Sequence, residues 1–573
     1  MWHKNLICLV FCVGVFFAHG EPVESMRRKY SSNWPQETLA KLNLRQKIGQ
    51  LLMVAAASNF SQANESLASA MQRSPYDMTS SHVEQMIREY GIGGVFFLYK
   101  SDPVTQSHLM QKFQNLSQVP LLFAQDSEWG LSMRLDLDPD QVVRYPHNLT
   151  LGAIKNSKLI YEIGYEIGRE CAAIGIHMNF APVADINNNS ENPVIHDRSF
   201  GDDPAEVAHR SLLFMQGLQA GGVLACGKHF PGHGDTSTDS HFSLPLIKHG
   251  RAHFDQVELV PFRALIQSGV NSMMLAHLAA PGLDDSGVAT SLSPKIVTDL
   301  LQDELGFTGL KITDGLGMGA VMLRYAPGEL ELQAFLAGND LMLGSLNVAK
   351  AIDLIENAIK SGQVSEQELD RRVLKVLQAK AQIFARQAKI GRKVLDFTKF
   401  LVRPAAQNLA KKAYRAAITQ VKQDSKIKFN KQNFAQSLIM QIGDLQVDQF
   451  SESCAKLKKQ VLKYSAKFDA NALQESLLAA QNYSRVIISI SEITKSAATN
   501  FGISNHALEL VQILKKQNKQ VVIVLFGTPY SIKLFLDANA ILVAYEDVPF
   551  AQEAIVDVLC GKLKPAGALP VKI

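Results

Sequence analysis

The sequence predicts an α/β protein, with a (β/α)8 TIM-type barrel followed by a second α/β sandwich domain. Eight short apolar runs recur along the chain with helical patterns between them, an alternation typical of parallel strands covered on both faces. Eight such units over roughly 350 residues match a closed barrel with insertions. A polar, basic stretch then separates these units from a further set of apolar runs, which predicts the second domain.

The elements of the barrel are predicted from periodicity and from capping signals. A helix is predicted over 157–174, where apolar residues recur at three- and four-residue spacing. Ser293-Pro294 predicts a helix start, with proline at the first helical position. Ser365 and Glu368 resemble a capping box. The runs predicted to be strands are Ile48–Val54, Gly94–Leu98, Leu121–Ala124, Met178–Val183, Val223–Gly227, Ser272–Ala276, Leu310–Thr313 and Asp340–Leu343.

Length and composition bound the class of protein. At 573 residues the chain is too long for one ordinary core. A hydrophobic fraction of 47% and a charged fraction of 20% are those of a soluble globular protein. The net charge of +4 is small for this length and the basic residues are dispersed, so no nucleic-acid partner is expected.

The first twenty residues resemble a signal peptide. Lys4 precedes an apolar run over 6–18, and Ala18-His19-Gly20 fits a small-residue cleavage site. We therefore expect export to the periplasm or the medium. The run is too short for a stable bilayer span, so no membrane anchor is expected after cleavage. The cysteines of the remaining chain lie mostly in apolar runs and are expected to be buried thiols; they are Cys171, Cys226, Cys454 and Cys560.

Polar residues follow five of the predicted strands. In a barrel these positions fall on the carboxyl rim, where active sites are built. Strand-end capping explains one or two such residues, whereas five convergent positions indicate a binding site. The residues are Asp126, Asp185, Lys228 with His229, His277 and Asp314.

The stretch from Lys228 to His241 carries the densest chemistry of the chain. It holds three histidines, two aspartates and a lysine after an apolar run. A solvated turn does not require so many titratable groups. Short zinc motifs usually place histidines on one helical face or pair them with cysteines, but Pro231 and Gly232 argue against a helix. We therefore expect neither a metal nor a cofactor here.

The same stretch resembles the signature of glycoside hydrolase family 3, in its β-N-acetylglucosaminidase branch. That signature reads Lys-His-Phe-Pro-Gly-His-Gly, then about four residues, then Asp-Ser-His. The resemblance implies that Asp239 and His241 form an acid/base dyad. It also implies that Asp314, in Thr-Asp followed by Met318, attacks the anomeric carbon to form a glycosyl-enzyme. Helix capping is the alternative role of this aspartate.

A histidine acid changes the usual two-carboxylate scheme. Retaining enzymes place two carboxyl groups about 5 Å apart, on opposite sides of one bond. Imidazole titrates near pH 6.5 and needs less adjustment than a carboxylic acid beside a carboxylate. Asp239 can fix the tautomer of His241 and stabilise its charged form. Because such a histidine repels phosphate less than a glutamate does, hydrolysis and phosphorolysis both stay open.

The resemblance also implies a set of sugar-binding residues. The segment 125–134 resembles Asp-x-Glu-Gly-Gly-x-x-x-Arg, with Trp129 in place of a glycine, where it narrows the loop or adds a stacking face. Asp185 matches a motif position whose role is to order its loop. Gly315 and Gly317 are expected to let the sugar approach the backbone. The residues expected to bind the sugar are Asp126, Arg134, Arg198, Lys228 and His229.

The predicted domains are a signal peptide over 1–20, a catalytic barrel over 21–386, a linker over 387–402 and an α/β domain over 403–573. Strands of the last domain are predicted over 485–490, 520–527 and 540–545, and the family's two-domain members have such a domain. The end of the chain, 567–573, resembles their closing strand.

The sequence thus predicts an exported retaining β-N-acetylhexosaminidase that removes non-reducing-end N-acetylglucosamine from peptidoglycan or chitin fragments, as a monomer. Within the family, the alternatives are a phosphorylase and a β-glucosidase whose glutamate acid comes from the second domain. A metal-dependent hydrolase is a further alternative. A sugar-binding protein on an inactive scaffold is the non-enzymatic one; loss of Asp314 or His241 would mark it, and both are present.

Overall fold

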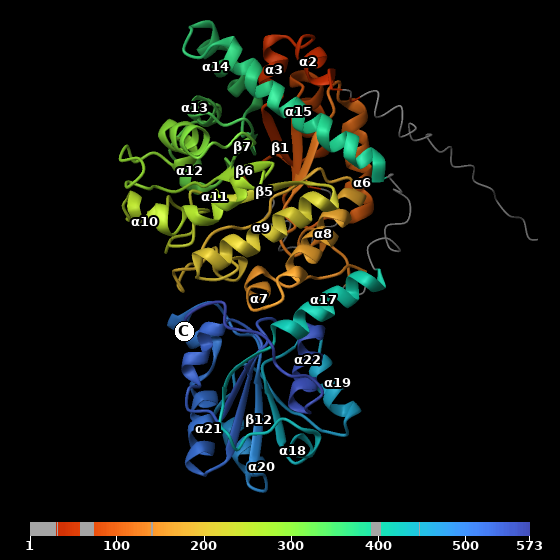
Figure 1. Cartoon of the computed structure of the whole chain (residues 1–573), viewed down its shortest axis with the longest axis vertical. Helices are drawn as coiled ribbons and strands as arrows, with labels where there is room; N and C mark the ends of the chain where they lie inside the picture. The colour runs from red at the N-terminus through yellow and green to blue at the C-terminus, as the bar shows by residue number, and fades with distance from the viewer. Residues whose placement is uncertain (1–29, 31, 58–73, 139–140, 391–402, 446) are drawn as a thin grey trace, which may run out of the picture.

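The computed structural model describes residues 30, 32–57, 74–138, 141–390, 403–445 and 447–573. The chain forms two domains stacked along the long axis, with helix α17 (Pro404–Ala417) at their junction (Figure 1). The predicted signal peptide lies outside the described residues. Across these ranges, no helix has the length and apolar character needed to cross a membrane.

The first domain is a nearly closed parallel barrel, which confirms the predicted fold. Its strands follow the order β7-β6-β5-β4-β3-β2-β1-β8. The two end strands meet through a bridge between Ile312 and Leu341. The strands are β1 (Leu52–Ala56), β2 (Gly94–Phe97), β3 (Leu122–Gln125), β4 (Met178–Asn179), β5 (Leu224–Phe230), β6 (Ser272–Leu275), β7 (Leu310–Thr313) and β8 (Met342–Leu343).

Helices surround the barrel and bury the stripes that the sequence predicted. Helix α8 packs tightly on α9, because a Cβ at Gly164 or Gly168 would lie 2.5 Å from a carbonyl oxygen of α9. The helices of this domain are α2 (Trp34–Leu39), α3 (Leu44–Gly49), α5 (Ser80–Gln85), α6 (Pro103–Leu116), α7 (Asn148–Gly152), α8 (Lys158–Ala173), α9 (Pro204–Gly221), α10 (Arg251–Gln256), α11 (Leu259–Gln267), α12 (Gly319–Met322), α13 (Glu329–Ala337), α14 (Val348–Lys360) and α15 (Glu366–Ile390), with the short or irregular η1 (Met86–Tyr90), η2 (Leu131–Met133), η3 (His196–Arg198), η4 (Thr290–Leu292) and η5 (Lys295–Glu304).

The predicted capping signals are found at two helix starts. The Ser293 hydroxyl accepts the N–H of Ile296, the second residue of η5, at 3.3 Å. The Ser365 hydroxyl accepts the N–H of Glu368 at 3.1 Å. The Glu368 carboxylate turns instead to Arg371 and Arg372, so this start has one of the two hydrogen bonds that the predicted capping box requires.

Several predicted boundaries are wrong; the predicted strand 178–183, for example, ends at Asn179 as β4. The run 48–54 begins inside helix α3, and strand β1 starts only at Leu52, because an apolar run does not distinguish a buried helix from a strand. Strand β5 continues to Phe230, so Lys228 and His229 belong to the strand rather than to the loop after it. Residues 387–390 continue α15 instead of opening the linker, and 391–402 lie outside the described residues.

The second domain is a six-stranded sheet with helices on both faces (Figure 1). Neighbouring residues of one strand, such as Ile487 and Ile488, enter separate core clusters, which accounts for the continuous apolar runs of its central strands. In the order β11-β10-β12-β13-β14-β9, only β9 is antiparallel. The elements are β9 (Thr419–Gln423), α18 (Lys431–Ala435), β10 (Leu438–Ile442), α19 (Gln449–Lys456), β11 (Leu462–Tyr464), α20 (Ala470–Ala480), β12 (Arg485–Ile490), η6 (Ala497–Gly502), α21 (Asn505–Lys516), β13 (Gln520–Leu525), η7 (Pro529–Leu534), β14 (Ala540–Val543) and α22 (Pro549–Leu559).

The end of the chain is not the predicted closing strand. Residues 567–573 adopt no strand and instead return to the barrel domain. The N–H of Ala568 donates to the Ala153 carbonyl at 2.9 Å, and the Pro570 carbonyl accepts from the Asp202 N–H at 3.1 Å. Pro570 has no N–H to offer a sheet, which favours this docking over strand pairing. The four predicted thiols are free and buried, as expected.

Candidate active site

The polar residues predicted at the barrel rim gather at one mouth. Asp126 follows β3, Lys228 and His229 end β5, and Asp314 follows β7. Because all barrel strands are parallel, these positions share the carboxyl end of the barrel.

Two carboxylates and three cations form an ion network on one side of the mouth. The buried Lys228 Nζ lies 2.8 Å from Asp126 Oδ1 and 2.7 Å from Glu128 Oε1. Arg134 donates to Asp126 at 2.5 Å. Arg198 donates to both oxygens of Glu128, at 3.1 and 2.8 Å. The network holds these charged groups in fixed positions through contacts within the protein.

The charges of the network set the protonation of its acids. Burial by itself raises the pKa of Asp126, but Lys228 and Arg134 outweigh it and hold the pKa well below its ordinary value. For Glu128 the same competition, decided mainly by Arg198 and Lys228, lowers the pKa to about 2. Both carboxylates are therefore ionised at neutral pH and act as hydrogen-bond acceptors.

Glu128 was not among the predicted site residues. Its signal was present, because the motif Asp-x-Glu places a second acid beside Asp126. Trp129 makes a ring contact inside the protein. Its ring packs on His147, with centroids 4.2 Å apart.

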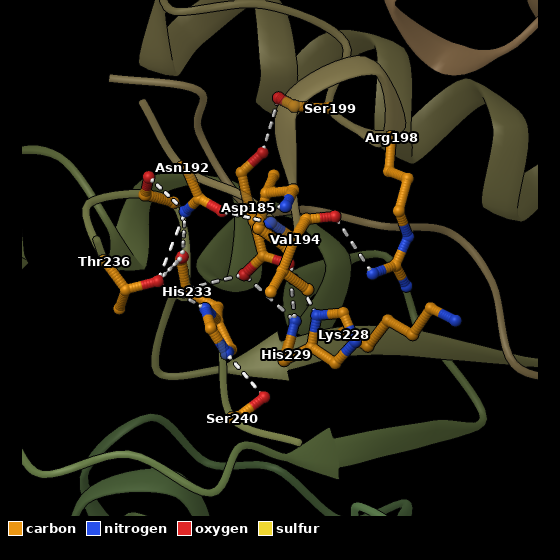
Figure 2. Close-up of polar contacts among 12 residues, drawn as sticks. Asp185, Asn192, Val194, Arg198, Ser199, Lys228, His229, His233, Thr236 and Ser240 are labelled. Atoms are coloured by element: carbon orange, nitrogen blue, oxygen red, sulfur yellow. Dashed lines mark hydrogen bonds and ion pairs between the residues drawn. The ribbon is translucent and has the colours of Figure 1, made fainter. Parts of the chain in front are cut away.

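Asp185 organises the start of the loop after β5 (Figure 2). It accepts the backbone N–H groups of His229 at 3.1 Å and of His233 at 2.7 Å, and its carboxylate lies 2.6 Å from His229 Nδ1. His233 Nε2 lies 3.2 Å from the hydroxyl of Ser240. This contact fixes Ser240, farther along the loop, relative to His233. Burial lowers the pKa of His233 to about 4, so this ring is neutral at neutral pH.

Asp314 is partly buried at the end of β7. Its Oδ1 accepts the N–H of Gly315 at 2.8 Å. Burial raises its pKa, but His229, His277, this N–H and Lys228 together lower it below the ordinary value. Asp314 is therefore an ionised carboxylate at neutral pH, with its orientation fixed by the backbone.

The glycines after Asp314 make room for a side chain, which the sequence analysis did not anticipate. A Cβ at Gly317 would lie 2.6 Å from Cζ of Tyr76, and a Cβ at Gly315 would lie 3.1 Å from the Tyr76 hydroxyl. That hydroxyl accepts the N–H of Gly317 at 2.7 Å. Tyr76 thus fixes the turn that follows the nucleophile candidate.

His241 and Asp239 lie on the far part of the β5 loop. His241 Nδ1 is 2.7 Å from Asp239 Oδ1, and 61% of the imidazole side chain is exposed. The His241 carbonyl accepts the N–H of Gly319 at 3.1 Å, and the Ser240 carbonyl accepts the N–H of Ala320 at 3.2 Å. These bonds join the loop to the segment that starts with Asp314, so both candidates share one mouth.

The predicted residues therefore divide into two groups. Ion pairs of one network join Asp126, Arg134, Arg198 and Lys228. Asp314 lies close enough to His229 and Lys228 to interact with their charges. His241 and Asp239 are brought to the mouth only by the backbone of their loop. Within the described parts of the chain, no three or more His, Cys, Asp or Glu side chains form a group that could hold a metal ion.

The chain is similar to known proteins over most of its length. The glycosyl hydrolase family 3 N-terminal domain matches residues 43–379, and the C-terminal domain of the same family matches 336–573. Beta-hexosaminidase A of Pseudoalteromonas piscicida is 28% identical over 560 residues, covering 86% of this chain and 91% of that protein. A beta-hexosaminidase of Nitrosospira multiformis is 33% identical over 268 residues, covering 45% of this chain and 75% of that protein.

A solved structure shares the two-domain arrangement. The family 3 beta-N-acetylglucosaminidase from a Paenibacillus species superposes with a TM-score of 0.76 at 29% identity. The match covers 93% of this chain and 99% of that one.

Proposed function

The chain belongs to glycosyl hydrolase family 3, and we propose that it is an exported, retaining β-N-acetylhexosaminidase. In this proposal it removes N-acetylglucosamine from the non-reducing end of peptidoglycan or chitin fragments. The names of its relatives support the activity class. The observation that carries the proposal is the joining, at one barrel mouth, of an ionised Asp314 to the loop of the Asp239–His241 pair.

In the first step the ion network binds the hydroxyl groups of the terminal sugar. Asp314 attacks the anomeric carbon, and the bond between that carbon and the leaving oxygen breaks. The proton of His241 Nε2 passes to the leaving oxygen, so the departing group leaves as an alcohol. Asp239, bonded to Nδ1 at 2.7 Å, stabilises the imidazolium before transfer and keeps the correct tautomer afterwards.

In the second step water replaces the leaving group. Neutral His241 takes a proton from the water as its oxygen bonds to the anomeric carbon. The bond to Asp314 breaks and the carboxylate is restored. Two displacements at one carbon return the β configuration, so the product keeps the configuration of the substrate.

The exposure of His241 adds a requirement to this scheme. A ring that is 61% exposed delivers its proton efficiently only when it lies over the leaving oxygen. In the complex, His241 Nε2 must therefore lie within hydrogen-bond distance of the leaving oxygen. The stem of the loop stays fixed by the contacts of His233 and Ser240.

A substrate panel on the purified protein tests the proposal. We expect a chromogenic N-acetylglucosaminide to be cleaved much faster than the glucoside, at a rate independent of phosphate and of chelators. Retention is checked by following the first-formed anomer by NMR. Equal cleavage of the glucoside would favour a β-glucosidase, phosphate-dependent turnover a phosphorylase, and binding without turnover a sugar-binding protein.

Export is tested separately, because the fold carries no information on it. The full-length chain is expressed with its own N-terminus, and the mature protein is recovered from periplasm and medium. We expect the mature N-terminus at residue 21. Retention of the intact leader in the cytoplasm would contradict this part of the proposal.

A further inference from the structure

The carboxyl edge of the sheet in the second domain faces the barrel domain. In α/β domains this edge is the usual place for a ligand. Here the loops after β12, β13 and β14 meet the first domain instead, at the junction seen in Figure 1. Lys495 bonds to Asp197 at 2.5 Å, Thr528 lies 3.3 Å from His196, and the Glu546 carboxylate accepts the N–H of His147 at 2.8 Å. Loops of the barrel domain thus occupy the edge.

The barrel residues touched in this way stand next to the sugar-binding network. His196 and Asp197 directly precede Arg198, whose guanidinium holds Glu128. His147 packs on Trp129, the neighbour of Glu128. The second domain therefore contacts the sequence neighbours of both Arg198 and Glu128. It contacts Asp197, next to Arg198, directly, and it reaches Trp129, next to Glu128, through the His147 ring.

A chain of polar contacts links these neighbours. His147 Nδ1 lies 3.1 Å from Asp197 Oδ2, and His147 Nε2 lies 3.8 Å from Glu546 Oε2. Thr150 donates to Glu546 at 2.7 Å. Burial alone would raise the pKa of Asp197, but the hydrogen bond and charge of His147 and the charge of Lys495 lower it, so the acid stays ionised.

The backbone of the same segment gives an independent observation. His196 has φ of +36°, in the left-handed region that side chains other than glycine rarely adopt. Such a conformation persists when surrounding contacts fix it. Two of those contacts come from the second domain, from the Thr528 hydroxyl and from the ring of Tyr530, whose centroid is 5.6 Å from that of His196.

We propose that Lys495 and Glu546 are positioning residues for the active site. Acting through Asp197 and His147, they hold Arg198 and Glu128 in the geometry that binds the terminal sugar. The second domain thereby sets substrate affinity without touching the substrate. This inference rests on the proposed function only in taking the Arg198–Glu128 pair as part of the sugar site.

Lys495→Ala tests the first contact, with Lys463→Ala as the matched control. Both lysines belong to the second domain, are about half exposed and form one ion pair, but Lys463 pairs with Asp448 of its own domain. We expect Lys495→Ala to raise KM about fivefold, as for a weakened ion pair, with kcat and Tm close to those of the control. Lys495→Arg should restore KM.

Glu546→Gln tests the second contact. The amide oxygen still accepts from the His147 N–H and from Thr150, while the negative charge beside the His147 ring is lost. We expect a rise in KM with unchanged kcat and an unchanged far-UV spectrum. Glu553→Gln, which weakens an ion pair with Lys411 inside the second domain, is the control and should leave KM unchanged.

Hydrogen exchange of the free protein tests the same inference without a substrate. Peptides covering 194–200 should exchange faster in Lys495→Ala and Glu546→Gln than in their controls. This readout keeps its meaning even if no glycoside is turned over, an outcome that would contradict the proposed function alone. Variants that match their controls in exchange, and in KM where turnover is measured, would overturn the inference.

Discussion

The two sides of the barrel mouth differ in how firmly their side chains are held. On the side of the ion network, the Lys228 side chain is 2% exposed and makes two ion pairs. On the side of the loop after β5, His241 is 61% exposed and bonds to Asp239 alone among the side chains that the structure describes. The charged groups of the ion network are thus fixed by several partners within the protein, whereas one side-chain contact holds the His241 ring. Preorganised charges need little rearrangement when a ligand binds, and an exposed ring stays accessible to a ligand.

The largest expected effect lies where the two sides meet, at Asp314. Asp314→Ala removes the attacking oxygen, so kcat should fall by about 10⁴-fold or more, as when other nucleophiles are removed. The loss should be equally severe for activated aryl and for sugar leaving groups. Initial rates with both substrate types, together with Tm as a folding control, measure it. Residual activity above a few per cent would contradict the role of Asp314.

His241→Ala should separate the two sides of the mouth. Removal of a general acid costs about 10²–10⁴-fold when the leaving group needs a proton. We therefore expect a severe loss of kcat/KM for a disaccharide and a much smaller loss for a nitrophenyl glycoside, whose leaving group departs unprotonated. The ratio of the two losses is the measurement. Equal losses would show that His241 acts by binding rather than by proton transfer.

Glu128→Gln tests the held side. The change removes the charge that Lys228 and Arg198 share as a buried partner. We expect this loss to weaken substrate binding about 10- to 100-fold. We expect KM to rise by that amount, with the same factor for aryl and disaccharide substrates. Glu84→Gln, which weakens a surface pair with Lys112, is the control and should change neither KM nor kcat. A loss that depends on the leaving group would contradict a pure binding role.

The smallest expected effect concerns a buried acid outside the mouth, Glu170. Its burial is not offset: although the Tyr145 hydroxyl donates to it at 2.7 Å and Arg169 lies 4.0 Å away, its pKa is raised to about 8. The folded protein therefore keeps a proton that the unfolded chain releases above its ordinary pKa of 4.5. Stability from this group is complete below that value and is lost as the pH rises toward 8.

Glu170→Gln removes this dependence while keeping an oxygen for Tyr145. We expect the variant and the parent to have similar Tm at pH 5, and the variant to be more stable by a few degrees at pH 8. Thermal unfolding across this range measures the difference, and activity should not change. If the difference in Tm between parent and variant did not change with pH, Glu170 would be ionised in the folded protein.

Much of the site followed from local sequence. Asp126 and Asp314 were predicted because each follows an apolar run that ends at one rim of a parallel barrel. Glu128 was missed, although its motif names it, because its role depends on Arg198, seventy residues away. The glycines beside Asp314 were assigned to the sugar because nothing in the sequence indicates that Tyr76 fills their space.

The sequence by itself determined the order of elements, the barrel and the identity of the candidate acids, since each is recorded in periodicity or in a short motif. Only the tertiary structure decided where β1 begins, that 567–573 return to the barrel, and that Glu546 bonds to His147. Those features depend on contacts between residues far apart in the chain. A local pattern records which side chains are buried or polar, and the fold alone selects their partners.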